Sequence, residues 1–560
     1  MASASALPVA GPAIGRARGG ARRLDGIRSL TVATWAACAF VVLLPLGAII
    51  ILASGSFQLG ALLQDDVLEA GLNSLVSAGV SAVLAVIVGT AFAILLDRTD
   101  LPGRRTLRLL ALTPLLVPPF VGAIAWLGVL GPASPVNQWW MQLTGAPLWS
   151  IYGGDGVIML LTIHSYPLAM LIVAAALRRI PADLEQAARI SGAGPARVLG
   201  TVTLPLLRPA LLSSLLLIAV GNLADFGIPS IIGLPERYVT LATLVYRYLQ
   251  SGTVAEPLAV VATIGTLLLA VALLAVLADA LSGRRGRELD AAASPTSPLA
   301  LGAARIPTAV VTWAIVLAIT ILPLLALLTQ ALLRAPGLPL VWQNLTLDNL
   351  VRALTSANAL TGARNSILLA LGAALVCGVL GLAIAVLATR TRIRTTRALQ
   401  ATVMLPQAIP GIVIAVAWLI LAPRLGLFNT PWLILVAYVT SFTALVVQAI
   451  AAPLAGTPAS AEEAARISGA TRLRALIDIS CRMALPAALS GMVIVAVTAV
   501  RELTLSVLLL SPGSQTLGVA IFSFQQAGAF STAAAWSLIV AVLGIAVIGI
   551  ATRAPAGRSG

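Results

Sequence analysis

The segment Glu-Gln-Ala-Ala-Arg-Ile-Ser-Gly at residues 185–192 recurs, with one change, as Glu-Glu-Ala-Ala-Arg-Ile-Ser-Gly at residues 462–469. An identical alanine follows each copy, and a proline follows each glycine at the same spacing, as Pro209 and Pro486. Both copies interrupt otherwise apolar sequence. A repeat of this length, 277 residues apart, indicates an internal duplication, so the chain is interpreted as two related halves.

The composition is typical of a polytopic membrane protein. The chain has 560 residues, of which 10% are charged, and a mean hydropathy of +1.01. These values are far too apolar for a soluble globular protein. The sequence contains arginine but no lysine. A P-loop requires its lysine to bind phosphates, so the chain cannot itself be a P-loop ATPase.

Neither metal binding nor nucleic-acid binding is indicated. The three cysteines are scattered without a CxxC pair, at Cys38, Cys377 and Cys481, and small apolar packing residues are the simplest interpretation. The single histidine, His164, lies in an apolar stretch, which favours a packing role. The net charge of +15 is attributed to membrane orientation. We therefore assign no fixed metal site and no cofactor.

Apolar segments of about 20 or more residues recur along the chain, and each is long enough to cross a hydrocarbon core of about 30 Å as a helix. They are residues 31–53, 72–96, 109–130, 156–177, 210–233, 257–281, 308–333, 365–388, 398–421, 432–455, 487–510 and 531–552. We predict an all-α polytopic protein with about twelve transmembrane helices.

The predicted organisation has two six-helix halves. The ranges are a tail at 1–30, a first half at 31–281, a Ser/Pro/Ala-rich linker at 282–306, a second half at 307–552 and a tail at 553–560. Six spans per half is an even number, so the halves run in the same direction and form parallel repeats.

Arginine placement predicts the orientation. Arginines crowd every second connection, including both repeated loops, whereas the alternate connections hold few of them. Those few are Arg237, Arg247, Arg334, Arg352, Arg364 and Arg424. Positive residues favour the cytoplasmic side, so both termini and both repeated loops are expected there.

Each repeated loop is predicted to be a short helix, a glycine turn and a second short helix. In each copy a glutamate and an arginine four residues apart are spaced for an ion pair, and a glycine fits a left-handed helix cap. The pairs are Glu185 with Arg189 and Glu462 with Arg466, and the glycines are Gly192 and Gly469. A solvated connecting loop is the alternative, although two near-identical copies argue against it. A surface displayed twice suits a dimeric partner.

The pattern Glu-Ala-Ala, three residues, Gly resembles the EAA loop of ABC importer permeases, the inner-membrane components of binding-protein-dependent transport. In that family the loop forms a coupling helix that docks into a groove of the ATPase subunit. The resemblance covers nearly the whole chain as two fused permease halves of the type I importer kind. The second loop departs from the usual Leu-Pro, with Cys481-Arg482 in its place. The loop residues that the resemblance assigns to ATPase coupling are Glu185, Ala187, Ala188, Arg189, Gly192, Pro205, Glu462, Glu463, Ala464, Ala465, Arg466, Gly469 and Pro486.

Two carboxylates after the loops are candidates for a substrate path. Asp225 and Glu502 share the spacing of the loops and fall within predicted spans, where a charge is costly and therefore a functional candidate. They could line a path for a cation. The structural alternative is that Asp225 caps a broken helix and Glu502 pairs with neighbouring Arg501.

The fused layout, together with Glu502-Leu-Thr-Leu-Ser506 and Thr516-Leu517, resembles iron(III) permeases. Fe(III) prefers oxygen ligands, which the two acids would offer, although they would equally suit a polyamine or thiamine. The expected function is the permease subunit of an ATP-driven importer for ferric iron in a bacterial inner membrane. The chain itself would not be an enzyme.

The resemblance implies two protein partners besides membrane lipid: an ABC ATPase dimer on the cytoplasmic side and an extracytoplasmic solute-binding protein. Import of thiamine, a polyamine or a phosphonate remains an alternative. An ion-coupled secondary transporter would need buried charges in several spans and would leave the paired loops unexplained. A membrane scaffold would support no ATP-dependent flux.

Overall fold

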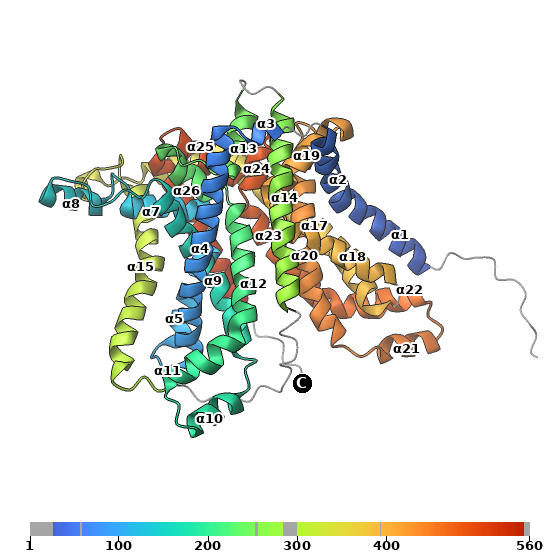
Figure 1. Ribbon diagram of the computed structural model, residues 1–560. Coiled ribbons are helices and arrows are strands. Elements are labelled where there is room, and N and C mark those ends of the chain that lie inside the picture. The colour runs from blue at the N-terminus through green and yellow to red at the C-terminus, as the bar shows by residue number, and fades with distance from the viewer. Residues whose placement is uncertain (1–25, 56–58, 252–255, 284–298, 392–393, 554–560) are drawn as a thin grey trace, which may run out of the picture.

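A computed structural model describes residues 26–55, 59–251, 256–283, 299–391 and 394–553, and these ranges fold into helices joined by turns (Figure 1). Most of the predicted tails and of the predicted linker lies outside the described residues, although residues 26–30 of the first tail form the start of α1 (Gly26–Cys38). Within the described ranges there is no named strand. The all-α class predicted from the sequence is confirmed.

The first half holds the helices that follow the N-terminus. They are α1 (Gly26–Cys38), α2 (Leu44–Gly55), α3 (Leu59–Leu62), α4 (Asp65–Arg98), α5 (Arg104–Ala111), α6 (Thr113–Leu116), α7 (Pro119–Leu130), α8 (Pro135–Thr144), α9 (Gly154–Leu177), α10 (Ala182–Ile190), α11 (Pro195–Val198), α12 (Leu204–Leu223), α13 (Leu241–Gln250) and α14 (Pro257–Gly283).

The second half repeats the pattern. Its helices are α15 (Arg305–Leu332), α16 (Asp348–Thr355), α17 (Ala357–Arg390), α18 (Arg394–Met404), α19 (Gly411–Leu425), α20 (Pro431–Ala455), α21 (Ser460–Ile467), α22 (Arg472–Ala475), α23 (Arg482–Val500), α24 (Thr504–Leu508), α25 (Leu517–Gln526) and α26 (Phe530–Arg553).

By length and composition, 10 helices in the described part of the chain could cross a membrane, or 11 if one bent pair counts as a single span. A shorter apolar helix, Phe530–Ala546, adds to these. The chain is thus polytopic, as predicted, but four predicted spans are wrong as continuous helices. They are residues 109–130, 210–233, 398–421 and 487–510.

The breaks have local causes. A proline lacks an N–H and clashes with the preceding turn, so a helix cannot run through Pro118 or Pro410 without distortion. The chain bends by 106° between residues 394–408 and 411–425. The other two helices, α12 and α23, end at Leu223 and Val500, directly before the segments that contain Asp225 and Glu502.

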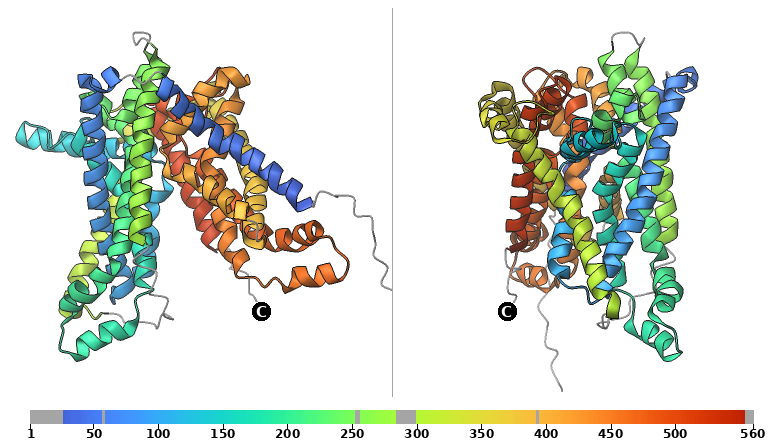
Figure 2. Two further views of the ribbon diagram at one scale, coloured as in Figure 1. Left: turned by 45° about the vertical axis from the view of Figure 1, so that its right-hand side comes forward. Right: turned by 90° about the vertical axis from the view of Figure 1, so that its left-hand side faces the viewer.

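The two halves pack in the same way, and the first helices of each half also contact the other half. In the first half α4 packs against α9 and α12, and in the second half α17 packs against α20 and α23. The first helices cross over, because α2 contacts α19 of the second half and α15 contacts α7 of the first. The two bundles meet near α13 and α24 and diverge toward the end that carries α10 and α21 (Figures 1 and 2).

Equivalent glycines permit close helix packing in both halves. A Cβ added at Gly89 on α4 would lie 2.6 Å from the backbone oxygen of Tyr166 on α9. A Cβ added at Gly381 on α17 would lie 2.8 Å from Cβ of Val446 on α20. Small residues let helices in a membrane approach closely, so these glycines allow α4 to pack tightly on α9 and α17 on α20.

We expect Gly89→Ala to lower the stability of the permease fold by about 1–3 kcal/mol, because overpacking forces α4 and α9 apart. The measurement is thermal unfolding of the purified chain in detergent. The matched control is Gly79→Ala in the same helix, where no atom lies within 4 Å of an added Cβ. Equal melting temperatures for the two variants would contradict the close packing.

Candidate functional site

The two repeated loops have the same backbone form. In the first, α10 ends before Gly192, whose φ is 84°, and α11 follows; in the second, α21 ends before Gly469, whose φ is 92°. No atom lies within 4 Å of a Cβ added at either glycine. Glycine is therefore needed here for the left-handed backbone and not for space. Both loops project from the same end of the molecule (Figure 1).

Each loop presents an isolated apolar side chain at its tip. Ile190 is 89% exposed and its repeat equivalent, Ile467, is 88% exposed. An apolar side chain exposed to water is unfavourable, so burial of these isoleucines against a partner protein would be favourable. Gln186 and Glu463 are also exposed and equivalent, so the two loops differ in charge at that position.

The predicted ion pairs within the loops are wrong. Among the described residues, neither Glu185 with Arg189 nor Glu462 with Arg466 forms an ion pair. Both glutamates instead turn toward the body of their own half. A buried carboxylate requires a partner, and in each half an arginine outside the loop supplies it.

In the first half that arginine is Arg98, the last residue of α4. Its Nη1 lies 3.5 Å from Oε2 of Glu185, and both side chains are more than nine-tenths buried. The hydroxyl of Thr203 donates to Oε1 of the same carboxylate at 3.0 Å. Nη2 of Arg98 also donates to the backbone oxygen of Leu177, the last residue of α9, at 2.8 Å.

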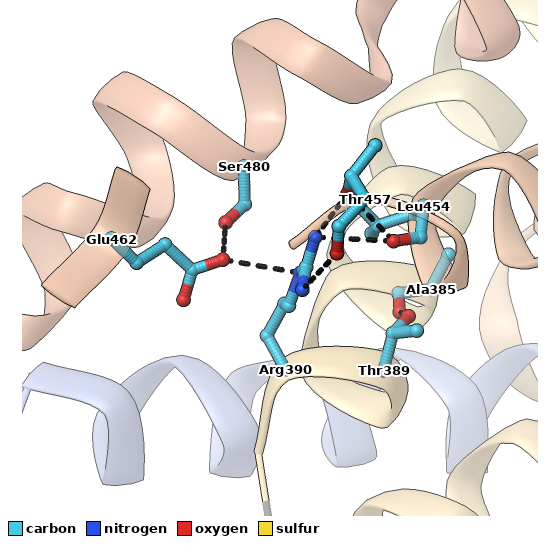
Figure 3. A network of polar contacts seen from close by, with 7 residues as sticks. All are labelled: Ala385, Thr389, Arg390, Leu454, Thr457, Glu462 and Ser480. Atoms are coloured by element: carbon cyan, nitrogen blue, oxygen red, sulfur yellow. Dashed lines mark hydrogen bonds and ion pairs between the residues drawn. The ribbon is translucent and has the colours of Figure 1, made fainter. Parts of the chain in front are cut away.

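The second half repeats these contacts, as Figure 3 shows. Nε of Arg390, the last residue of α17, lies 3.1 Å from Oε1 of Glu462, as an ion pair without hydrogen-bond alignment. The hydroxyl of Ser480 donates to the same oxygen. Nη2 of Arg390 donates to the backbone oxygen of Leu454 at 3.1 Å, and Nη1 donates to that of Thr457.

The two candidate path acids face one cavity of about 240 Å³, together with Arg501. Oδ1 of Asp225 accepts from the backbone N–H of Ile228 at 2.8 Å. Oε2 of Glu502 accepts from the N–H of Leu505 at 2.8 Å. Each acid therefore caps the helical turn that follows the break in its half.

Arg501 has a role that the sequence did not reveal. Its Nη2 donates to the backbone oxygens of Leu115, near the end of α6, and Val117, in the break before α7, at 2.7 and 3.1 Å. It forms no ion pair with Glu502 among the described residues, so this part of the structural alternative is wrong. The neighbouring carbonyls lack helical partners, which explains why the guanidinium turns to them.

The equivalent place in the other half is open. Ala224 stands where the repeat has Arg501, and it lines a cavity of about 290 Å³ with Gln407 and Ile409. The latter two are the repeat equivalents of Leu115 and Val117. The difference between arginine and alanine thus makes the centre of the molecule asymmetric. Comparing the neighbours of the two acids in the sequence would have revealed it.

The remaining candidates give no site. His164 packs beside Gly122, where an added Cβ would lie 2.4 Å from its Nε2. Cys38 and Cys377 are buried and Cys481 is partly buried, all with free thiols. Over the described ranges, no group of three or more His, Cys, Asp or Glu side chains is placed to hold a metal ion.

The family description "Binding-protein-dependent transport system inner membrane component" matches residues 89–287 and 378–554, one segment in each half. The chain belongs to this family. Each matched segment contains one repeated loop and the Arg–Glu ion pair that holds it. The chain is therefore a multi-pass membrane permease built from two fused repeats.

Several curated proteins are similar to this permease. A probable ABC transporter permease protein of Sinorhizobium fredii is 28% identical, over 96% of this chain and 98% of that protein. An Fe(3+)-transport system permease protein of Haemophilus influenzae is 23% identical, over 81% and 84%. A probable molybdenum ABC transporter permease protein of Haloferax volcanii is 31% identical, over 41% of this chain and 86% of that protein.

We expect Asp225→Ala to destabilise the permease by about 1 kcal/mol through loss of the cap, whereas Asp225→Asn retains an acceptor and changes stability little. Thermal unfolding in detergent measures both. Glu236→Ala serves as a control, since Glu236 is an exposed acid in the same region. If the alanine and asparagine variants melt together, Asp225 does not act as a cap.

Proposed function

We propose that this permease is the transmembrane subunit of an ATP-driven importer and that α10 and α21 dock onto an ABC ATPase dimer in the cytoplasm. The observation that supports this most strongly is the duplicated loop with its exposed isoleucine. A partner with two equivalent grooves would cover both tips, as pseudo-twofold symmetry requires. Within this proposal, Ile190 and Ile467 are the apolar anchors.

The opposite end is proposed to receive a solute-binding protein. The segments predicted to face outward are residues 131–155, 234–256, 334–362 and 511–530. They include α8, α13 and α16. Figure 1 places α8 and α13 far from α10 and α21, so the two proposed partners would not compete for one surface.

Transport then follows from relative motion of the two halves. Closure of the ATPase dimer would bring α10 and α21 together, and the two bundles, which diverge toward that end, would close with them (Figure 2). ATP shifts this equilibrium only if it binds the closed state of the ATPase more tightly. The permease itself would carry out no chemistry.

Ferric iron is the proposed cargo. The Haemophilus relative named for Fe(3+) transport aligns along most of this chain. The carboxylates of Asp225 and Glu502 provide hard oxygen ligands, which Fe(III) prefers, at a cavity between the halves. A second candidate is a molybdenum oxyanion, favoured by Arg501 on the same cavity and by the relatives named for molybdenum. The two cargos carry opposite charge, so uptake experiments separate them.

An ion-coupled secondary transporter is less well supported. It would leave unexplained why two loops with exposed isoleucines repeat at one end of the molecule. The charges at the centre, Asp225, Glu502 and Arg501, all satisfy backbone groups at helix breaks. An ATP-coupled permease accounts for both sets of observations.

Replacing Ile190 and Ile467 together by serine should weaken binding of the ATPase at least about tenfold, because two apolar anchors of an interface are lost. The measurement is co-purification of the partner ATPase with membrane-inserted permease. Leu347→Ser is the control, since Leu347 is 65% exposed in a segment predicted to face outward. Undiminished ATPase binding by the double variant would rule out these tips as the docking site.

The combination of Asp225→Asn and Glu502→Gln should reduce labelled Fe(III) uptake several-fold in cells with the complete system. The amide side chains keep an oxygen that can cap the helices, but the substitutions remove both negative charges. Unlabelled molybdate, thiamine, spermidine and a phosphonate are added as competitors in parallel. The iron proposal is supported if Fe(III) uptake is unchanged by these competitors and is lower in the variant than in the wild type. Competition by molybdate would move the cargo to the oxyanion class.

A further inference from the structure

We infer that Arg98 and Arg390 are positioning residues that lock each coupling loop to the ends of two long helices of its own half. The contacts stand on the structure alone, whereas their role in transport rests on the proposed function. Neither arginine lies within a loop, so the contact links parts of the chain that are distant in sequence.

Each arginine joins three elements at one point. Arg98 is the last residue of α4. It forms an ion pair with Glu185 of α10 and donates a hydrogen bond to the backbone oxygen of Leu177 at the end of α9. A guanidinium has several donors in a fixed plane, so a single side chain can hold both partners in a defined geometry. The last carbonyls of α9 lack partners within the helix, which makes that end a natural acceptor of a cationic donor.

The same four positions recur in the second half. Glu462, Ser480 and Leu454 lie 277 residues after Glu185, Thr203 and Leu177, and Arg390 lies 292 residues after Arg98. The second half keeps the contacts although other loop positions have changed, such as Pro205, which corresponds to Arg482. A random surface ion pair would not be expected twice with the same hydroxyl and carbonyl partners.

Burial makes these contacts stiff. The side chains are only 7% and 9% exposed in the first half and 9% and 15% exposed in the second. Separating the charges would leave each without its partner in a low-dielectric site, which is strongly unfavourable. A displacement of α10 therefore moves the ends of α4 and α9 with it, and α21 likewise moves α17 and α20. The contact thus converts movement of the docking loop into movement of the transmembrane helices.

The first test measures amide hydrogen exchange in the full-length permease in lipid nanodiscs, without any partner. Arg98→Ala should speed exchange in α10 about tenfold or more, since removing one partner of a buried ion pair destabilises the contact by at least that factor. Exchange in α21 should stay unchanged, and Arg390→Ala should give the reverse pattern. Arg98→Lys should give an intermediate rate, because lysine keeps the charge but not the planar fork.

The matched controls are Arg105→Ala and Arg397→Ala. These arginines are also equivalent between the halves but are exposed. A double-mutant cycle of Arg98→Ala with Glu185→Gln should be non-additive, so that the pair exchanges no faster than the single arginine variant. Exchange in α10 that is the same in Arg98→Ala and Arg105→Ala would overturn the inference.

The second test measures ATP hydrolysed per Fe(III) imported in proteoliposomes that contain the complete transporter. Arg98→Ala combined with Arg390→Ala should raise this ratio at least several-fold while the ATPase remains bound. An unchanged ratio with loosened loops would overturn the coupling role. If the wild-type permease binds no ATPase, the proposed function fails, but the exchange experiment still decides whether the arginines hold the loops.

Discussion

A lipid bilayer offers no water to backbone groups, so every break in a membrane helix must be satisfied from within the protein. The centre of this permease follows that constraint closely. The break after α12 is capped by Asp225, the break after α23 is capped by Glu502, and the carbonyls between α6 and α7 are satisfied by Arg501. The charges that we propose for cargo binding are thus the same charges that make the broken helices possible. The cavity between the halves and the stability of the broken helices therefore depend on the same side chains.

The same constraint explains the loop end. Glu185 and Glu462 turn inward and are largely shielded from solvent, so each needs a cation. Arg98 at the end of α4 and Arg390 at the end of α17 provide it. The outward faces of the same short helices keep exposed isoleucines. Each repeated loop therefore has one side fixed to its own half and another side exposed. This division of roles is repeated in both halves, whereas the central cavity is asymmetric.

Sequence reasoning predicted the class and the duplication because both depend on local quantities, namely apolar length and residue identity. The helix breaks were missed because hydropathy carries no information on backbone geometry, although Pro118 and Pro410 mark two of the breaks. The wrong ion pairs have a different cause. Helical spacing favoured Arg189 for Glu185, but burial selected Arg98, which is distant in sequence and adjacent in space. Alignment of the two halves with each other contains the signal for both Arg98 and Arg501, whereas no local pattern does.

The central claim is that the two loops move together when ATP binds and carry the halves with them. Spin labels placed by Ser191→Cys and Ser468→Cys, with Cys481→Ser to remove the partly exposed native thiol, would report the distance between the loops by double electron–electron resonance. The measurement uses the complete transporter in lipid, with and without ATP under conditions that block hydrolysis. The account predicts a shorter distance with ATP. An unchanged distance in a complex that still imports its cargo would contradict it.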